Sequence, residues 1–213
     1  MKIYTIILAK GNSERIKNKN LYKINGIPLL KYSIDHSKNS KLVSETFISS
    51  ESKEIEALAK NNKVNFIKRP KYLCQKKSTS EDGLIHALKK ISKNFDLPDY
   101  TVFLQVTSPF RKKNHIDNCI KKIINDNADS IFSSSLYKNH VWNIKNNNNL
   151  EPINHDISYH LMHQYKFNQI IENGSIWIFN TKKFLKYKNR LFGKISHYLM
   201  DEKYSYQIDE MHD

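Results

Sequence analysis

The N-terminal segment KIYTIILAKGNSERIKNKN, residues 2–20, carries the strongest indication of how this chain folds. Its first eight residues are rich in β-branched and aromatic side chains, which predicts a short buried strand. Turn formers follow at Gly11-Asn12-Ser13. The loop also holds four cationic side chains, at Lys10, Arg15, Lys17 and Lys19. Such a loop can wrap a polyphosphate with N–H groups and cations, and a merely solvated basic surface is the alternative.

The loop matches neither of two common phosphate-binding patterns. It is not a G-x-x-x-x-G-K-[ST] P-loop and not a G-x-G-x-x-G dinucleotide fingerprint. If it binds phosphate, it does so through a third class of motif.

The length and the cysteine content of the chain limit its class. A chain of 213 residues can form one domain with a substantial core, so a single domain over residues 1–213 is expected. Cys74 and Cys119 lie far apart without C-x-x-C spacing, which suggests neither a zinc site nor a disulfide framework. No segment approaches the roughly 20 apolar residues of a membrane span. We expect a soluble, unprocessed cytoplasmic protein.

The formal net charge of +14 raises the question of nucleic-acid binding. The lysines, however, are dispersed through every segment, and the run at 147–149 points to a general Lys/Asn bias. No known DNA- or RNA-binding motif appears. Anionic small molecules are the more economical explanation of the charge, and no specific nucleic acid is expected as a partner.

Helical and strand-like segments alternate along the chain. The expected strands cover residues 2–9, 46–50, 64–67, 100–106, 130–134, a turn and strand within 172–179, and 204–209. The expected helices cover residues 28–40, 51–60, 80–92 and 114–125, with a further helix start within 182–187. This alternation predicts an α/β fold, a Rossmann-like three-layer α/β/α sandwich around a mainly parallel sheet.

Two features go beyond this regular pattern. The polar segments after Ala9, after Leu104 and at Ser78-Thr79-Ser80 can converge on the carboxyl edge of the sheet, where ligands of such folds bind. Residues 136–168 are polar, aromatic and histidine-rich without clear periodicity, and they are too long for an ordinary connection. An inserted arm is expected there.

Four segments together resemble one enzyme family. They are LAKGNSERIKNKN (8–20), LQVTSPFR (104–111), ENGSIWIF (172–179) and YQID (206–209). In the same order and at comparable spacing, they are similar to motifs of the acylneuraminate cytidylyltransferases, or CMP-sialic acid synthetases, which have the nucleotide-diphospho-sugar transferase fold. An HAL stretch at 86–88 adds to the match, which covers essentially the whole chain.

The resemblance implies a reaction and a setting. It implies transfer of a cytidylyl group from CTP to the anomeric hydroxyl of a sialic-acid-like 2-keto sugar acid, with release of pyrophosphate, for surface glycan biosynthesis. It also implies Mg²⁺ as cofactor and a cytoplasmic homodimer whose arm reaches into the neighbouring subunit. The chemistry suits the sequence, because transfer at phosphorus needs positioning and charge neutralisation more than a nucleophile and base.

The resemblance assigns the first loop to CTP. The residues concerned are Leu8, Ala9, Lys10, Gly11, Asn12, Ser13, Arg15, Lys19 and Asn20, with Lys10, Arg15 and Lys19 as catalytic cations. Lys10 stands where the family usually has arginine and loses the bidentate fork, and Lys17 replaces a common proline and is expected at the surface. The small-hydroxyl loop of Ser78, Thr79 and Ser80 occupies the place that approaches cytidine in the family, and capping of the next helix explains it equally well.

The acceptor is assigned to three other segments. The residues are Gln105, Thr107, Ser108 and Arg111 at a strand end, Asn173 and Gly174 at an NG turn, and His163 and Gln164 in the arm. A strand-end glutamine that satisfies backbone groups and a plain type I′ hairpin turn are the alternatives.

The acidic motif departs from the family. Two aspartates two residues apart generally share one face of a strand as magnesium ligands, whereas this chain has Gln207 and Asp209. Asp209, expected to be catalytic, is the one secure carboxylate. A single aspartate with a glutamine carbonyl can still suffice, because Mg²⁺ keeps waters and takes phosphate oxygens as ligands.

Two other functions stay open at this point. One is a cytidylyltransferase for the eight-carbon acid Kdo, although residues 104–111 lack the carboxylate of the LQGDEP-type strand end of those relatives. The other is a non-catalytic nucleotide- or nucleic-acid-binding protein of the same fold.

Overall fold

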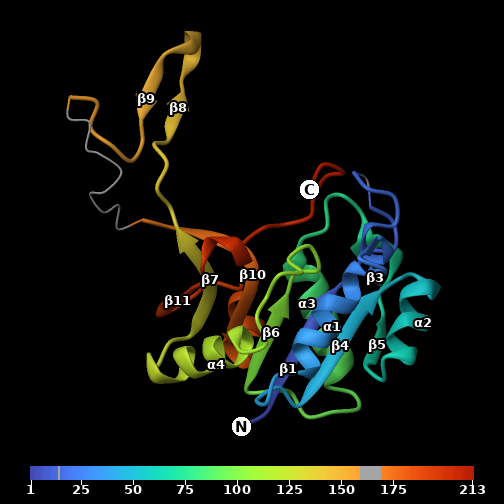
Figure 1. The fold of residues 1–213 in the computed structure, drawn as a ribbon. Helices are drawn as coiled ribbons and strands as arrows, with labels where there is room; N and C mark the ends of the chain where they lie inside the picture. Colours follow the sequence, from blue (N-terminus) through green and yellow to red (C-terminus); the bar gives the residue numbers. More distant parts are fainter. Residues whose placement is uncertain (14, 159–168) are drawn as a thin grey trace.

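A computed structural model describes residues 1–13, 15–158 and 169–213 (Figure 1). Its centre is a seven-stranded sheet of order β11-β7-β10-β6-β1-β4-β5. The strands are β1 (Ile3–Leu8), β4 (Glu45–Ser50), β5 (Asn65–Lys68), β6 (Tyr100–Leu104), β7 (Ser130–Leu136), β10 (Ile170–Asn180) and β11 (Ile195–Leu199). All neighbours pair in parallel except β10, which runs antiparallel to both β6 and β7. The prediction of a mainly parallel sheet is confirmed.

Helices cover both faces of this sheet (Figure 1). They are α1 (Leu29–Lys38), α2 (Lys53–Asn61), α3 (Ser80–Ile91), α4 (His115–Asn125) and α5 (Thr181–Tyr187). Buried apolar residues of α1, α2 and α4 pack in one cluster against the sheet, and those of α3 and α5 pack in a second cluster on the other side. The three-layer α/β/α architecture predicted from the alternation of elements is therefore confirmed.

Side-chain caps fix the starts of two helices near the carboxyl edge of the sheet. Ser52 accepts a hydrogen bond from the Ile55 amide at the start of α2. Thr79 caps α3 and forms a capping box with Asp82. These caps satisfy N–H groups that a helix start leaves free, and they place the preceding loops at that edge.

A small hairpin projects from the body of the molecule (Figure 1). It consists of β8 (Trp142–Ile144) and β9 (Leu150–Pro152), joined through the 3₁₀ turn η3 (Asn146–Asn148). It lies within the segment expected to form an arm. The remaining short elements are β2 (Lys23–Ile24), β3 (Ile27–Pro28), η1 (Lys19–Leu21), η2 (Lys71–Cys74) and η4 (Glu202–Tyr204).

The C-terminal segment differs from its prediction. Residues 204–209 do not form a strand. Among their backbone groups, the Ile208 amide alone bonds to a distant part of the described chain, donating to the Thr107 carbonyl at 2.8 Å. The final strand is instead β11, which pairs with the outer side of β7. Within the described ranges, no helix has the length and apolar character needed to cross a bilayer.

The expected turn at Asn173-Gly174 is also wrong. Both residues lie within β10, whose register with β7 shifts between Glu172 and Trp177. Gly174 adopts φ +67°, which glycine tolerates and which accommodates this bulge. The strand therefore continues through the dipeptide instead of folding back on itself.

Candidate active site

A pocket opens at the carboxyl ends of β1 and β6, which are adjacent in the sheet. From β1 the chain moves outward through β4 and β5 and then returns to β6 on the other side of β1. This reversal is the topological switch point at which doubly wound folds bind ligands. The pocket is lined by Leu8, Lys10, Ser13, Lys19, Asn20, Arg69, Leu73, Ser78, Thr79, Ser80, Phe103 and Gln105. The three polar segments predicted to converge do so here.

A second cavity continues outward from the first. The two share Lys10, Ser13 and Lys19, and the outer one adds Asn12, Arg15, Cys74, Lys76 and Asp209. Their volumes, about 280 and 480 Å³, together fall in the range of small-molecule and cofactor sites. The cations predicted from the first loop thus line one continuous, positively charged recess.

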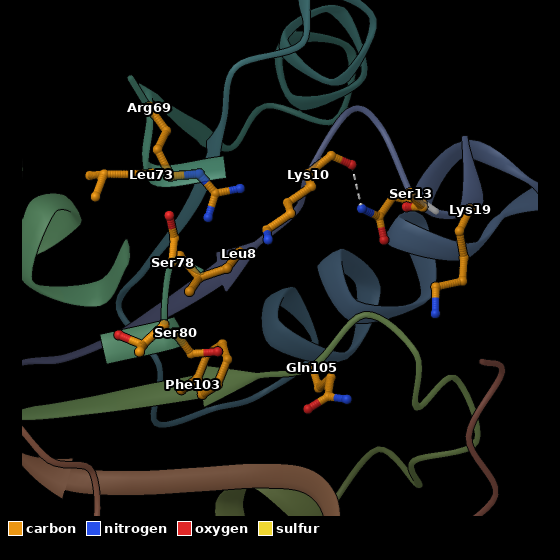
Figure 2. Close-up of a pocket in the computed structure, with 12 residues that line it drawn as sticks. Leu8, Lys10, Ser13, Lys19, Arg69, Leu73, Ser78, Ser80, Phe103 and Gln105 are labelled. Carbon is orange, nitrogen blue, oxygen red and sulfur yellow. Dashed lines mark hydrogen bonds between the residues drawn. The ribbon is translucent and has the colours of Figure 1, made fainter. Parts of the chain in front are cut away.

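The first loop is held in shape by its own contacts. The Asn20 amide is buried and donates to the Lys10 carbonyl at 2.7 Å, which ties the end of the loop to its start. The Lys10 ammonium donates to the Gln75 carbonyl at 3.1 Å across the pocket. Figure 2 shows the side chains of Lys10 and Arg69 directed toward the same space, with Gln105 at the end of the neighbouring strand.

Two expected loop ligands have their amides engaged elsewhere. The Ala9 amide donates to the Ser49 carbonyl at 3.1 Å, and the Gly11 amide donates to a Glu51 carboxylate oxygen at 2.8 Å. Neither residue lines the recess. These N–H groups are therefore engaged within the protein and not free to bind phosphate, and contact of Ala9 and Gly11 with CTP stays a prediction.

Lys19 and Asp209 bring the two ends of the chain together. The ammonium lies 2.7 Å from the carboxylate, and the Lys19 side chain is only 14% exposed. Arg15 lies 3.7 Å from Glu210 at the exposed rim. The C-terminal segment therefore forms one wall of the recess.

Arg69 is a site residue that the sequence did not reveal. It is 3% exposed and lines the inner pocket, and its Nε and Nη2 atoms have no hydrogen-bond partner among the described residues. The nearest carboxylate, Glu51, is 3.9 Å away. Buried N–H groups without hydrogen bonds cost free energy, so the position of Arg69 indicates a group that meets an anionic or polar ligand. In the sequence Arg69 resembles any surface cation before a proline.

The small-hydroxyl loop both lines the pocket and caps the helix that follows it. Ser78, Thr79 and Ser80 all line the inner pocket. Thr79 also caps α3, and the Ser78 hydroxyl donates to the Tyr72 carbonyl at 2.7 Å. The helix-cap explanation is confirmed for Thr79, and it coexists with a place in the pocket wall.

Gln105 is held at the floor of the pocket by a short chain of amides and hydroxyls. Its Nε2 donates to Thr107 Oγ1 at 2.9 Å and to Gln207 Oε1 at 3.2 Å. The Gln207 amide in turn donates to the Asn173 carbonyl at 2.8 Å. A β-carbon on Gly174 would lie 2.2 Å from Gln207 Nε2, so glycine is needed for this contact.

The hydrogen bonds of this network place Gln207 and Thr107 differently from their predicted positions. The Gln207 side-chain oxygen faces Gln105 and Thr107, and Gln207 lines neither cavity of the recess. Gln207 is thus placed to position Gln105, and its role as a metal ligand stays a prediction. Thr107 is buried and serves the same purpose, so its expected direct contact with the acceptor is corrected.

Arg111 and Ser108 also lie beneath the site instead of lining it. Arg111 is 4% exposed and donates to Ser33 Oγ, the Gln105 carbonyl and the Ser175 carbonyl at 3.1, 2.6 and 2.7 Å. Burial lowers its pKa to about 9. Ser108 is fully buried and donates to the Gly174 carbonyl at 3.3 Å. Their expected contacts with the acceptor are corrected to supporting the segment that carries Gln105.

Asn173 has a comparable structural role. Its side-chain oxygen Oδ1 accepts from Ser133 Oγ at 2.6 Å, and its side-chain Nδ2 donates to Ser205 Oγ at 3.0 Å. The side chain is buried, so the expected contact of Asn173-Gly174 with a sugar is corrected. His163 and Gln164, the other predicted acceptor residues, lie outside the described residues.

Comparison with known proteins identifies the family. Residues 4–211 match the sequence profile of a family described as cytidylyltransferase. This chain belongs to the cytidylyltransferase family. The resemblance first noted in four short segments of this cytidylyltransferase is therefore confirmed over nearly its whole length.

Several curated relatives are similar in sequence. The N-acylneuraminate cytidylyltransferase of Escherichia coli is 30% identical over all of this chain and half of its own length. Post-translational flagellin modification protein B of Campylobacter coli is 27% identical over 98% of this chain and 90% of its own. A Helicobacter pylori protein named for pseudaminic acid cytidylyltransferase and a hydrolase is 33% identical over 64% of this chain and 26% of its own. The chain thus spans about half, or less, of the first curated relatives it matches.

Solved structures share the fold at low sequence identity. A CMP:2-keto-3-deoxy-manno-octonic acid synthetase complexed with CTP has a TM-score of 0.70 at 12% identity, over 99% of this chain and 94% of its own. The 4-diphosphocytidyl-2C-methyl-D-erythritol synthase of Anaerococcus prevotii has a TM-score of 0.68 at 14% identity, with the same coverage. These similarities establish the fold alone.

Proposed function

We propose that this cytidylyltransferase transfers the cytidylyl group of CTP to the anomeric hydroxyl of a sialic-acid-like 2-keto sugar acid and releases pyrophosphate. The observation that carries the proposal is the recess at the switch point, where Lys10, Arg15, Lys19 and Arg69 surround one space. A triphosphate is the ligand class that such a concentration of cations suits. The family membership and the names of the relatives support cytidine as its base.

The residues divide between the two substrates. In the proposed reaction, the acceptor hydroxyl attacks the α-phosphorus of CTP, and the bond to the pyrophosphate oxygen breaks. Lys10, Lys19 and Arg69 would hold the triphosphate and neutralise the charge that moves onto pyrophosphate. Gln105, at the floor of the inner pocket, would orient the acceptor, because its carbonyl oxygen can accept from a sugar hydroxyl.

Magnesium fits this recess through one protein carboxylate. Asp209 lines the outer cavity, and the described residues contain no cluster of three or more acidic, histidine or cysteine side chains suited to a metal. Mg²⁺ commonly takes one or two carboxylates and fills its remaining positions with phosphate oxygens and water. We assign Asp209 as the ligand; the bound ion would offset negative charge on the phosphates.

A second subunit is part of the proposal. The β8–β9 hairpin and the residue that follows it leave apolar side chains exposed to water. The exposed fractions of Trp142, Ile144, Leu150 and Ile153 are 42, 71, 61 and 62%. Exposed apolar clusters of this kind mark interaction surfaces. We propose that the hairpin packs against a second copy of the chain, and sedimentation analysis should find a dimer; a monomer at micromolar concentration would contradict this.

The function is tested by measuring pyrophosphate release from CTP and Mg²⁺ with a panel of sugar acids. N-acetylneuraminate, legionaminate, pseudaminate and Kdo cover the acids suggested by the relatives and by the shared fold. Release should require CTP, with ATP, GTP and UTP inactive, and should require one of the nine-carbon acids. Activity with Kdo alone would favour the second candidate, and no release with any acid would reject catalysis. A cytoplasmic role in surface glycan synthesis belongs to the same proposal.

A further inference from the structure

Glu51 occupies an unexpected place beside a site for an anion. It follows the last residue of β4, directly before the Ser52 cap of α2, and its side chain is 17% exposed. Its carboxylate lies behind the recess and contacts three segments that form the wall: the first loop, the end of β5 and η2. A negative charge so close to a triphosphate site would weaken binding unless it serves another purpose.

The contact with the first loop is a close one. The Gly11 amide donates to Glu51 Oε1 at 2.8 Å. A β-carbon on Gly11 would lie 2.6 Å from the β-carbon of Ser52, so the loop backbone approaches the start of α2 as only glycine permits. The hydrogen bond and the close approach together fix the loop between Lys10 and Ser13, both of which line the recess.

The second oxygen of Glu51 faces the opposite wall. Glu51 Oε2 accepts from the Cys74 thiol at 2.9 Å and lies 3.9 Å from Nη2 of Arg69. Burial and the neighbouring Glu51 raise the pKa of Cys74 to about 11, so the thiol keeps its proton and donates it. Glu51 thus faces the Arg69 guanidinium, whose Nε and Nη2 atoms have no hydrogen-bond partner in the described part of the chain.

The carboxylate stays charged in this setting. Burial by itself raises the pKa of Glu51, but hydrogen bonds from Cys74 and from the Gly11 amide outweigh it and hold the pKa below its ordinary value. An ionised carboxylate that accepts an amide and a thiol and faces a guanidinium has its acceptor sites matched by donors.

We propose that Glu51 is a positioning residue for CTP: its carboxylate joins the Gly11 amide to the Arg69 guanidinium and so sets the width of the triphosphate recess. This inference rests on the proposed function. Glu51 does not itself touch the nucleotide; it orders the two walls that do. The benefit of that order exceeds the repulsion between its charge and the phosphates.

Removal of the Glu51 carboxylate should change the KM for CTP in different ways, depending on whether Glu51 positions the walls of the recess or has no part in binding. If Glu51 positions the walls, Glu51→Ala raises the KM for CTP roughly 10- to 100-fold, the size expected for losing a charge-assisted hydrogen bond. If it is a bystander, removing its charge leaves the KM unchanged or lowers it. Glu54→Ala is the matched control, because Glu54 is a neighbouring exposed carboxylate that accepts a hydrogen bond from Ser52, and it should leave the KM within about twofold.

A second variant and a second readout separate positioning from folding. Glu51→Gln keeps the shape and a carbonyl oxygen for the Gly11 amide, so its KM should lie between those of the wild type and Glu51→Ala. Hydrogen exchange at the Gly11 amide should accelerate in Glu51→Ala and not in Glu54→Ala. In the double variant with Arg69→Met, the loss should be smaller than the product of the two single losses, because the two residues act through one contact.

Direct titration with CTP keeps this inference distinct from the proposed function. If the wild type binds no CTP, the proposed function fails. If the wild type binds CTP and both Glu51 variants bind it equally well, the positioning role of Glu51 is overturned while the proposed function stands.

Discussion

The Lys19 ammonium lies 2.7 Å from the Asp209 carboxylate, although 190 positions separate the two residues in the chain. Lys19 begins the 3₁₀ turn η1 at the end of the first loop, and Asp209 lies in the irregular C-terminal segment. Both line the outer cavity. The contact therefore joins the cation proposed for the triphosphate to the one carboxylate proposed for magnesium.

Asp209→Asn should reduce turnover much more than CTP binding. The amide oxygen can still accept a hydrogen bond from Lys19, but it lacks the charge with which Asp209 would hold Mg²⁺. We expect kcat to fall on the order of 100-fold and the dissociation constant for CTP to change less than about fivefold. Steady-state kinetics and titration calorimetry measure the two effects, with Asp96→Asn, which removes a carboxylate that pairs with Lys2, as the control. Unchanged turnover at saturating Mg²⁺ would falsify the metal role.

Arg69→Met should weaken CTP binding without destabilising the free protein. The Arg69 guanidinium is buried, and among the described residues its Nε and Nη2 have no hydrogen-bond partner. Its ion pair with Glu51 is long, at 3.9 Å, and Glu51 keeps the Gly11 amide and the Cys74 thiol as donors, so a methionine of similar length removes a desolvation cost. We expect the KM for CTP to rise roughly 10- to 100-fold while the thermal midpoint stays level or rises.

Arg111→Met provides the contrast for that experiment. Arg111 is equally buried but donates to Ser33 and to two carbonyls, so its loss leaves buried acceptors unpaired. The free energy of unfolding should fall by about 3 kcal/mol. Equal losses of stability in the Arg69 and Arg111 variants would contradict the distinction drawn between a ligand-facing and a structural arginine.

Gln207→Ala should impair use of the acceptor and spare CTP. The Gln207 side chain accepts from Gln105 and donates to the Asn173 carbonyl, so its removal frees Gln105 to rotate away from the pocket. The KM for the sugar acid should rise about tenfold, and the KM for CTP should stay within about twofold. Tyr206→Ala, at the neighbouring and largely exposed position, is the control. A larger effect on CTP than on the acceptor would restore Gln207 to the nucleotide or metal site.

The protein should lose stability between pH 6.5 and 4 because of His115. Burial lowers the pKa of His115 to about 4, and its Nδ1 accepts from the Lys112 amide beside the rings of Tyr198 and Tyr204. In that interval the unfolded chain binds a proton at this residue and the folded chain does not. The free energy of unfolding therefore decreases as the pH is lowered, by up to about 3 kcal/mol.

Denaturant unfolding at a series of pH values measures this effect. His115→Gln should flatten the dependence between pH 6.5 and 4, and His212→Gln, at an exposed position, should leave it as in the wild type. The same slope in His115→Gln as in the wild type would show that other groups carry the acid sensitivity.

The sequence predicted the parts of the fold that local pattern determines. The apolar runs of β1 and β6 and the periodic apolar faces of α1 and α3 mark their elements, and their alternation implies the switch point where Lys10 and Gln105 meet. The strand β11 escaped notice because ISHYL is a half-exposed edge segment with polar residues at its centre.

The errors at the site come from contacts between distant segments. Asn173-Gly174 has the local signature of a hairpin turn, but Asn173 bonds to Ser133 and Ser205, which hold it inside β10. Arg111 and Arg69 look alike in sequence, yet Arg111 donates to Ser33 and to two backbone carbonyls beneath the site, whereas Arg69 lines the pocket. Local sequence identifies the segments that approach the site, and tertiary packing decides which side chains enter it.

In the proposed reaction the cytidylyl group of CTP becomes joined to a sugar acid through a phosphodiester, and ³¹P NMR of the reaction mixture tests this transfer most directly. With CTP, Mg²⁺ and the correct acid, the three CTP signals should give way to one phosphodiester signal and one equivalent of pyrophosphate, and mass spectrometry should find the CMP-sugar. Persistence of CTP with every acid, or formation of CMP and pyrophosphate without a sugar adduct, would contradict the proposed transfer.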